Sequence, residues 1–226
     1  QAADDAPDVV RISMDAKAKV DVGDFSRDGG SRAAEAPRAW DHDTQAKEKL
    51  VPYGPLNGTT GLLTIIIGTS GETRDFIGDC LDQWWEANKS QHANARRLVI
   101  NLDNGPENSR VRTQFRYRLA KFSDDTGLEI KLVYYPPYHS KYDLIERCWG
   151  ILEDHRNGTL LNSVTTVLEW ARTMTWNGVH PVVSLLEKSY DKGVRIAKSA
   201  FKAIESRLQR DNDLPKYEVL IQPQPI

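Results

Sequence analysis

The chain has 226 residues, 39% of them hydrophobic, which is enough apolar material for one large domain or for a domain with an appendage. Charged residues make up 27% and the net charge is −2, which excludes a disordered tail and a histone-like polycation. Cys80 and Cys148 lie far apart without a CxxC partner, which favours a reducing compartment over a disulfide. The longest apolar run, residues 61–67, is too short to span a bilayer.

The first third of the chain alternates between short apolar runs and polar segments. Residues 1–8 are acidic, and we expect them to form a disordered lead-in. Residues 21–48 hold three glycines, one proline and many charges without periodicity, which predicts a long exposed loop of the kind that is functional or disordered. Three strands are predicted from the apolar runs at residues 9–15, 50–53 and 62–67.

Helices and strands alternate in the rest of the chain. Apolar side chains at helical spacing predict a helix that begins after Thr73, and two later strands are predicted at residues 97–102 and 130–134. Further helices are predicted at residues 110–122, 143–155, 160–176 and 181–210.

This order of elements predicts an α/β fold of the ribonuclease-H-like class. The first, fourth and fifth strands are expected to be parallel, and parallel neighbours need crossover helices on the faces of the sheet. We therefore expect a mixed five-stranded sheet flanked by helices over residues 9–180, with a C-terminal helical extension over residues 181–226.

Two aspartates stand where apolar runs end. Asp15 closes the first run, and Asp103 stands where a later run breaks into an Asn-Gly-Pro turn that exposes it. Each has a structural alternative, because Asp103 can initiate the bend as an Asx-turn residue and Asp15 can be a solvated strand end. From the pattern alone, Asp15 also competes with Asp21 and Asp24.

A glutamate on a predicted helix completes the acidic set. Glu146 lies about one turn into the helix that starts near Asp143. Two strand-end aspartates and one helix glutamate can hold two divalent metals for phosphoryl transfer, and Mg²⁺ prefers such oxygen ligands. The alternative is a capping box, for which Asp143 and Glu146 have the right spacing. Glu153 and Asp154 are rivals on the same helix, but they are expected to lie farther from the strand ends.

Several short stretches match the patterns of one family. They are residues 13–20, 25–27 with 31–32, 41–43, 51–54, 103–108 and 135–142 with 145–150. On these stretches the chain resembles the Rhodopirellula-type DDE transposases of bacterial insertion sequences. The last two stretches are specific, and the resemblance runs from Val9 to about Leu220.

The resemblance implies a catalytic DDE triad of Asp15, Asp103 and Glu146 that works with two Mg²⁺ ions, for which Mn²⁺ can substitute. It implies that transposon-end DNA is cut and that the freed 3′-OH is joined to target DNA. It also implies a cytoplasmic, nucleoid-associated bacterial protein that forms a homo-oligomer on DNA, does not involve a membrane, and has a DNA-binding segment upstream of this chain. The alternatives are a structure-specific nuclease of the same fold and a domesticated DNA-binding or assembly protein that no longer cleaves.

One departure from the family pattern falls beside the acids. The family usually has Asn-Pro where this chain has Asp143-Leu144. Aspartate is as good an N-cap as asparagine, so we expect the helix to be intact. The extra carboxylate is expected to perturb the metal site.

Basic residues in four places are candidates for phosphate contact. The helix after Asp103 carries five cations without an intervening acid, and the helix predicted over residues 181–210 has a basic face opposite an apolar one. Solvated helix faces are the alternative, and His139 can instead serve a turn or a cap. The candidates are Arg27, Arg32, Arg110, Arg112, His139, Lys141, Arg195, Lys198 and Lys202.

Overall fold

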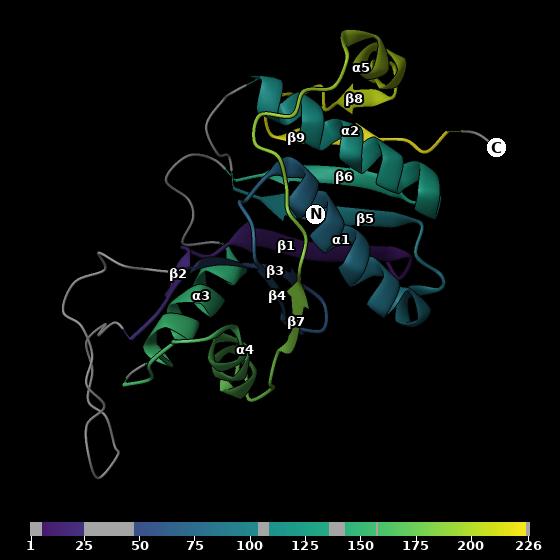
Figure 1. Ribbon diagram of the computed structural model, residues 1–226. Coiled ribbons are helices and arrows are strands. Elements are labelled where there is room, and N and C mark those ends of the chain that lie inside the picture. Colours follow the sequence, from purple (N-terminus) through teal and green to yellow (C-terminus); the bar gives the residue numbers. More distant parts are fainter. Residues whose placement is uncertain (1–5, 25–47, 104–108, 136–142, 157, 225–226) are drawn as a thin grey trace.

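A mixed sheet with helices on both faces makes up the described part of the chain (Figure 1). The computed structural model describes residues 6–24, 48–103, 109–135, 143–156 and 158–224, without the side chains of residues 109–112. Its strands are β1 (Val9–Ala16), β2 (Val20–Val22), β3 (Glu48–Asn57), β4 (Thr64–Gly68), β5 (Arg97–Leu102), β6 (Glu129–Tyr134), β7 (Val182–Leu186), β8 (Leu208–Arg210) and β9 (Glu218–Ile221). Its helices are α1 (Arg74–Asn88), the short 3₁₀ helix η2 (Lys89–His92), α2 (Ser109–Thr126), α3 (Leu144–Asp154), α4 (Val164–Thr173) and α5 (Lys198–Glu205).

The order β4-β3-β1-β5-β6 forms the centre of the sheet. β1 pairs antiparallel with β3, and β3 pairs antiparallel with β4. On its other side β1 pairs in parallel with β5, which pairs in parallel with β6. An antiparallel meander followed by two parallel strands is the ribonuclease-H-like arrangement, so the predicted fold class is confirmed.

Two cores lie on opposite faces of this sheet. Successive side chains of a strand point to opposite faces. Ile12 and Met14 of β1 therefore join the core that contains Phe76 of α1 and residues of α2. The other face is covered by α3 and α4, where Ile145 packs with Ile65 and further buried residues.

Local capping residues fix where two of the helices begin. Thr73 Oγ1 accepts a hydrogen bond of 3.2 Å from Phe76 N, so α1 begins where the sequence predicted. Ser163 and Thr166 form a capping box, which starts α4 later than the predicted residue 160. None of the described helices combines the length and apolarity needed to cross a membrane.

The C-terminal region differs from its prediction. Residues 181–210 were expected to be one helix, but β7 pairs in parallel with β4, and only Lys198–Glu205 is helical. β9 pairs with β6, and β8 pairs with β9, so this region extends the predicted five-stranded sheet at both edges. The apolar run of β7 completes the β4 edge. Gly193, with φ of 75°, lies in the left-handed region that interrupts a helix.

Residues 187–197, which we call the strap, connect the two edges of the sheet. The strap runs past α1 toward α5 in Figure 1. The Tyr190 ring meets Phe76 of α1 edge to face at 5.7 Å, and its hydroxyl donates to Asp79 Oδ2 at 2.8 Å. Lys188 Nζ donates to the same oxygen at 2.5 Å. The strap is therefore held on α1 by specific contacts.

The predicted lead-in and the predicted loop lie largely outside the described residues. Residues 1–5 of the lead-in and residues 25–47 of the loop are outside the described ranges. The start of the predicted loop is not irregular, because β2 pairs antiparallel with the first residues of β3.

Candidate active site

Asp15 and Asp103 are neighbours at the carboxyl ends of β1 and β5. The parallel register aligns Met14 with Leu102, so the next residue of each chain segment is an aspartate. Met14 and Leu102 belong to the core under α1 and α2. By alternation, the two aspartates belong to the opposite side of the sheet, which α3 covers.

Helix α3 brings a third predicted acid to this side. Asp143 is its N-cap, and Asp143 Oδ1 accepts a hydrogen bond of 3.3 Å from Ile145 N. Ile145 and Leu152 are fully buried in the core of this face. Glu146, in the first turn, is exposed, and the cap is provided by Asp143 without a capping box. The capping alternative for Glu146 is therefore not what this helix uses.

The pKa of Asp15 is raised by its burial and by the other acids near it. Burial is the largest cause that raises the pKa of Asp15, from 3.8 to about 7, and the negative charges of Glu146, Asp143 and Asp103 raise it further. A backbone hydrogen bond from Ala16 opposes this shift. The charges of Glu146, Asp143 and Asp103 thus all act on Asp15.

Asp143 is the most buried of these four acids, at 1% exposure. Burial first, and then the charges of Glu146 and Asp103, raise its pKa above the ordinary value. Its Oδ2 atom is buried and has no hydrogen-bond partner in the described part of the chain. An unpaired carboxylate oxygen beside other carboxylates is costly, and a hard cation or a proton offsets that cost.

The donor set fits Mg²⁺ in its chemistry, because all four side chains offer the oxygen ligands that this ion prefers. Within the described ranges, however, no three His, Cys, Asp or Glu side chains stand together as a ready-made metal site.

Asp15 and Asp103 line a hollow of about 200 Å³ at the end of the sheet, together with Glu72 and Arg74. Glu146 is not among its lining residues and approaches from the α3 side. Glu72 and Arg74 also line a second hollow of about 530 Å³, which reaches Arg195 in the strap. Sequence reasoning had not singled out Glu72 or Arg74, because neither belongs to a recognisable motif.

A third hollow, also of about 530 Å³, continues from Arg195 along α5. Lys198, Lys202 and Phe201 line it together with Glu205. The first and second hollows share Glu72 and Arg74 among their lining residues, and the second and third share Arg195.

A polar network behind the acids was not predicted. Ser13 Oγ donates a hydrogen bond to Asp143 Oδ1. The side chains of Ser13 and Asn101 are both hydrogen-bonded to the Tyr135 hydroxyl. Arg11 Nη1 donates to Asn101 Oδ1 at 3.3 Å. The available signal was the presence of polar residues inside the apolar runs, two positions before Asp15 and Asp103.

Glu153, a rival for the role of Glu146, has a different partner. It forms an ion pair with Lys17, which lies two residues after Asp15 and whose side chain is 8% exposed. This pair ties the end of β1 to the last part of α3. Glu153 is therefore engaged in holding the helix and is not directed to the strand-end aspartates.

The predicted phosphate contacts are distributed over several places. Arg195 lies in the strap, and Lys198 and Lys202 lie on α5. The expected continuous basic face of residues 188–210 is wrong, because only α5 is helical there and Lys188 pairs with Asp79. Arg110 and Arg112 lie in the first turn of α2, but their side chains are outside the description. The candidates outside the described residues are Arg27, Arg32, His139 and Lys141.

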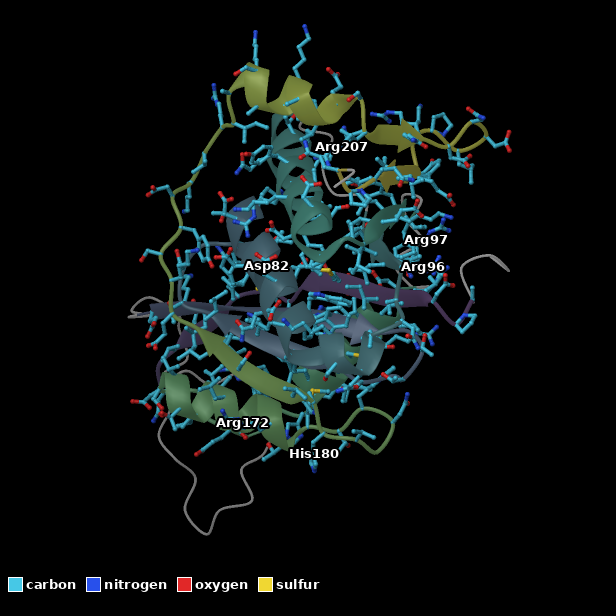
Figure 2. All side chains as sticks on the ribbon, turned by 90° about the vertical axis from the view of Figure 1, so that its right-hand side faces the viewer. Asp82, Arg96, Arg97, Arg172, His180 and Arg207 are labelled. Atoms are coloured by element: carbon cyan, nitrogen blue, oxygen red, sulfur yellow. The ribbon has the colours of Figure 1, made fainter. Side chains whose placement is uncertain are left out.

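One of the five cations counted on α2 faces inward. Arg118 Nη2 contacts Asp79 Oδ1 at 2.6 Å and Asp82 Oδ2 at 3.0 Å. Asp82, labelled in Figure 2, lies on α1, so these bonds join α1 to α2. Arg118 therefore serves the packing of the two helices, and the sequence could not distinguish it from the other cations of this helix.

Comparison with known proteins gives the following findings. The family model of the Rhodopirellula transposase DDE domain matches residues 1–223. Among solved structures, the integrase catalytic core domain of HTLV-2, in complex with magnesium and in dimeric form, is similar at 13% identity and a TM-score of 0.40, over 75% of this chain and 91% of that one. No curated protein matches the sequence.

A second similar structure is a chain of the simian T-cell lymphotropic virus intasome in complex with the PP2A regulatory subunit B56 gamma. The identity is 15% and the TM-score is 0.40. The match covers 64% of this chain, which spans 38% of the length of that one.

Proposed function

Because this chain belongs to the Rhodopirellula transposase DDE domain family, we propose that it cuts transposon-end DNA and joins the freed 3′-OH to target DNA. We propose Asp15, Asp103 and Glu146 as the catalytic acids. The observation that carries this proposal is the parallel register of β1 and β5, which makes Asp15 and Asp103 neighbours. The pKa of Asp15 agrees with it, because it is raised first by burial and then by the charges of Glu146, Asp143 and Asp103.

In this proposal the three acids hold two Mg²⁺ ions, for which Mn²⁺ can substitute. The bound metal would supply Lewis-acid stabilisation of the charge that develops on the scissile phosphate and its leaving oxygen. Asp15 has a pKa of about 7, so near neutral pH it must release its proton before it can act as a ligand. The chain itself contributes the rigid strand ends and the helix start that position the acids.

The three adjoining hollows support a path for DNA. Arg74 lines both the first and the second hollow, and Arg195 lines both the second and the third. Lys198 and Lys202 continue the path on α5. Gln114 also lines the second hollow, but its side-chain nitrogen donates to Asp75 Oδ1 at 3.0 Å. The cations of the path are suited to contact with phosphates and not to recognition of bases. The acids Glu72, Asp75, Asp191 and Glu205 line the same path.

The remaining parts of the proposal concern partners. Arg27, Arg32, Arg110, Arg112, His139 and Lys141 are kept as candidate phosphate contacts. We further propose that transposon-end and target DNA are both held by a homo-oligomer, because end joining needs two DNA molecules at one site.

A strand-transfer assay on labelled transposon ends tests this function. The protein is incubated with Mg²⁺, labelled ends and a target plasmid. The expected result is cleavage of the end followed by a joined product. Cleavage without joining would identify a structure-specific nuclease, and DNA binding without either product would identify a non-cleaving assembly protein. The variant Asp103→Asn serves as the inactive control.

A further inference from the structure

Each candidate catalytic acid has a polar residue just behind it on the same element. Ser13 stands two residues before Asp15 on β1, and Asn101 stands two residues before Asp103 at the end of β5. Because a strand repeats every two residues, each polar side chain points to the same face as its acid. Asp143 precedes Glu146 by three residues, at the N-cap of α3.

These polar residues are joined to one another. Ser13 Oγ donates to Asp143 Oδ1, and the same carboxylate oxygen accepts from Ile145 N and caps the helix. The Tyr135 hydroxyl is hydrogen-bonded to both Ser13 and Asn101, so it joins β1 to β5. Ser13 and Asp143 are 4% and 1% exposed. Water therefore does not compete for their hydrogen bond.

The three elements that carry the acids are held together by unequal means. β1 and β5 are fixed by the hydrogen bonds of the parallel ladder. α3 rests on the sheet through apolar side chains such as Ile145 and Leu152, and apolar packing has no preferred direction. The bond from Ser13 to Asp143 is directional, and it ties the first turn of α3 to β1 beside Asp15.

We propose that Ser13, Asn101, Tyr135 and Asp143 form a positioning network that sets the distance between Glu146 and the two strand-end aspartates, and thereby sets the affinity of the site for divalent metal. This inference rests on the proposed function, because it takes the three acids as metal ligands. Functional ligands must be held within about 0.5 Å of their productive geometry. Outer partners of metal ligands typically change metal affinity or activity about 10- to 100-fold when they are removed.

The first test removes the donor of the connecting bond. In Ser13→Ala the apolar packing of α3 is retained, but its first turn is no longer tied to β1. We expect the Mg²⁺ concentration at half-saturation, measured by thermal shift, to rise roughly 10-fold or more. The cleavage rate at saturating DNA should fall by a similar factor, while the DNA concentration at half-maximal rate stays the same.

Ser123→Ala is the matched control. Ser123 is also fully buried, and its hydroxyl donates to Leu128 O at 2.6 Å, at the end of α2. It has no link to the acids through the described hydrogen bonds. Both variants should lose thermal stability, but only Ser13→Ala should change the Mg²⁺ dependence. Equal Mg²⁺ dependence of Ser13→Ala, Ser123→Ala and the parent would overturn the proposal.

A second pair of variants separates positioning from helix capping. Serine is a good N-cap but is too short to reach Ser13, so Asp143→Ser keeps the cap and loses the connection. Asparagine can keep both the helix cap and the hydrogen bond from Ser13. The Mg²⁺ concentration at half-saturation should therefore be closer to that of the parent in Asp143→Asn than in Asp143→Ser. In the double variant of Ser13→Ala with Asp143→Ser, the two effects should not add, because both remove one bond. Full additivity would contradict the network.

The Mg²⁺ titration requires no DNA substrate, so it tests the positioning network separately from the proposed cutting and joining of DNA. A parent protein that binds Mg²⁺ through these acids but joins no DNA would refute the proposed function. The positioning network would then still be judged by the Mg²⁺ half-saturation of Ser13→Ala and Asp143→Ser.

Discussion

Lys17 and Glu153 form an ion pair between the residues after β1 and the last turns of α3, and its two ends are unequally buried. The Lys17 side chain is 8% exposed, whereas that of Glu153 is 48% exposed. A charge left alone in the interior costs far more than a charge left alone at the surface. The pair therefore holds α3 against the sheet, and the cost of breaking it depends on which partner is removed.

This asymmetry gives a stability prediction. Glu153→Ala leaves a buried ammonium group unpaired and should lower the free energy of unfolding by about 2 kcal/mol, below the range for a fully buried pair because Glu153 is half exposed. Lys17→Met leaves only a surface carboxylate and should cost less than about 1 kcal/mol. Urea unfolding of both variants provides the measurement. Equal losses would show that burial does not govern this pair.

Asp103→Asn tests the catalytic assignment. It keeps the side-chain shape but removes one of the charges that raise the pKa of Asp15. DNA cleavage should fall at least about 100-fold. The metal-free protein should be as stable as the parent or slightly more stable, because repulsion among the acids decreases.

Metal addition to the same variant provides the second measurement. A ligand that binds only the native state raises the free energy of unfolding by about 2.7 kcal/mol when its concentration is a hundred times its Kd. We expect Mg²⁺ to stabilise the parent in this way and to stabilise Asp103→Asn much less. Thermal unfolding with and without Mg²⁺ tests this. If Asp103→Asn unfolds without metal, Asp103 is a structural turn residue, and a fully active variant would refute the assignment.

The raised pKa of Asp15 predicts how metal-free stability depends on pH. Asp15 titrates at about 7 in the folded chain, against an ordinary value of 3.8. Between those values the folded state keeps a proton that the unfolded chain has lost, so the free energy of unfolding falls as pH rises from about 4 to about 7. At about 1.4 kcal/mol per pKa unit, Asp15 contributes a loss of roughly 2–4 kcal/mol.

Urea unfolding at about pH 5 and about pH 8, without metal, measures this loss. Asp15→Asn has no carboxyl group to titrate, so its decline over the same range should be smaller by the amount assigned to Asp15. Mg²⁺ should act in the opposite direction and stabilise the parent more at the higher pH, because its ligands must be deprotonated. An identical pH dependence in parent and variant would contradict the burial argument.

The basic path along α5 predicts a change in the salt dependence of DNA binding. Arg195, Lys198 and Lys202 are to be replaced together by glutamine. Affinity should fall by a similar factor for all DNA sequences, and the slope of log K against log salt should shrink by up to about 3.

The matched control for this triple variant replaces Lys89, Arg96 and Arg172. Figure 2 shows Arg96 and Arg172 on parts of the molecule away from α5. The control removes the same charge, so it should change affinity through net charge alone and leave most of the salt slope in place. Equal slopes for both triple variants would make the α5 surface a solvated or protein-binding face.

The sequence by itself determined the central fold and the places of the acids. Apolar alternation located the central strands, and Thr73 marked the start of α1 as predicted. The apolar runs that became β1 and β5 end at Asp15 and Asp103. The parallel pairing of these two strands then made the aspartates neighbours. These features are local, because periodicity, caps and turn residues act over a few positions.

Only the tertiary structure decided which polar residues meet. The bond from Ser13 to Asp143 joins residues 130 positions apart, and the strap places Lys188 on Asp79 over a similar separation. The C-terminal region carries apolar residues at helical spacing, yet the unpaired edges of β4 and β6 draw its segments into strands. Pairing with β4 and β6 satisfies backbone hydrogen-bonding groups at the two edges of the sheet, and the local sequence of the C-terminal region cannot reveal that these edges exist. Tertiary context therefore overrides the helical periodicity of the C-terminal region.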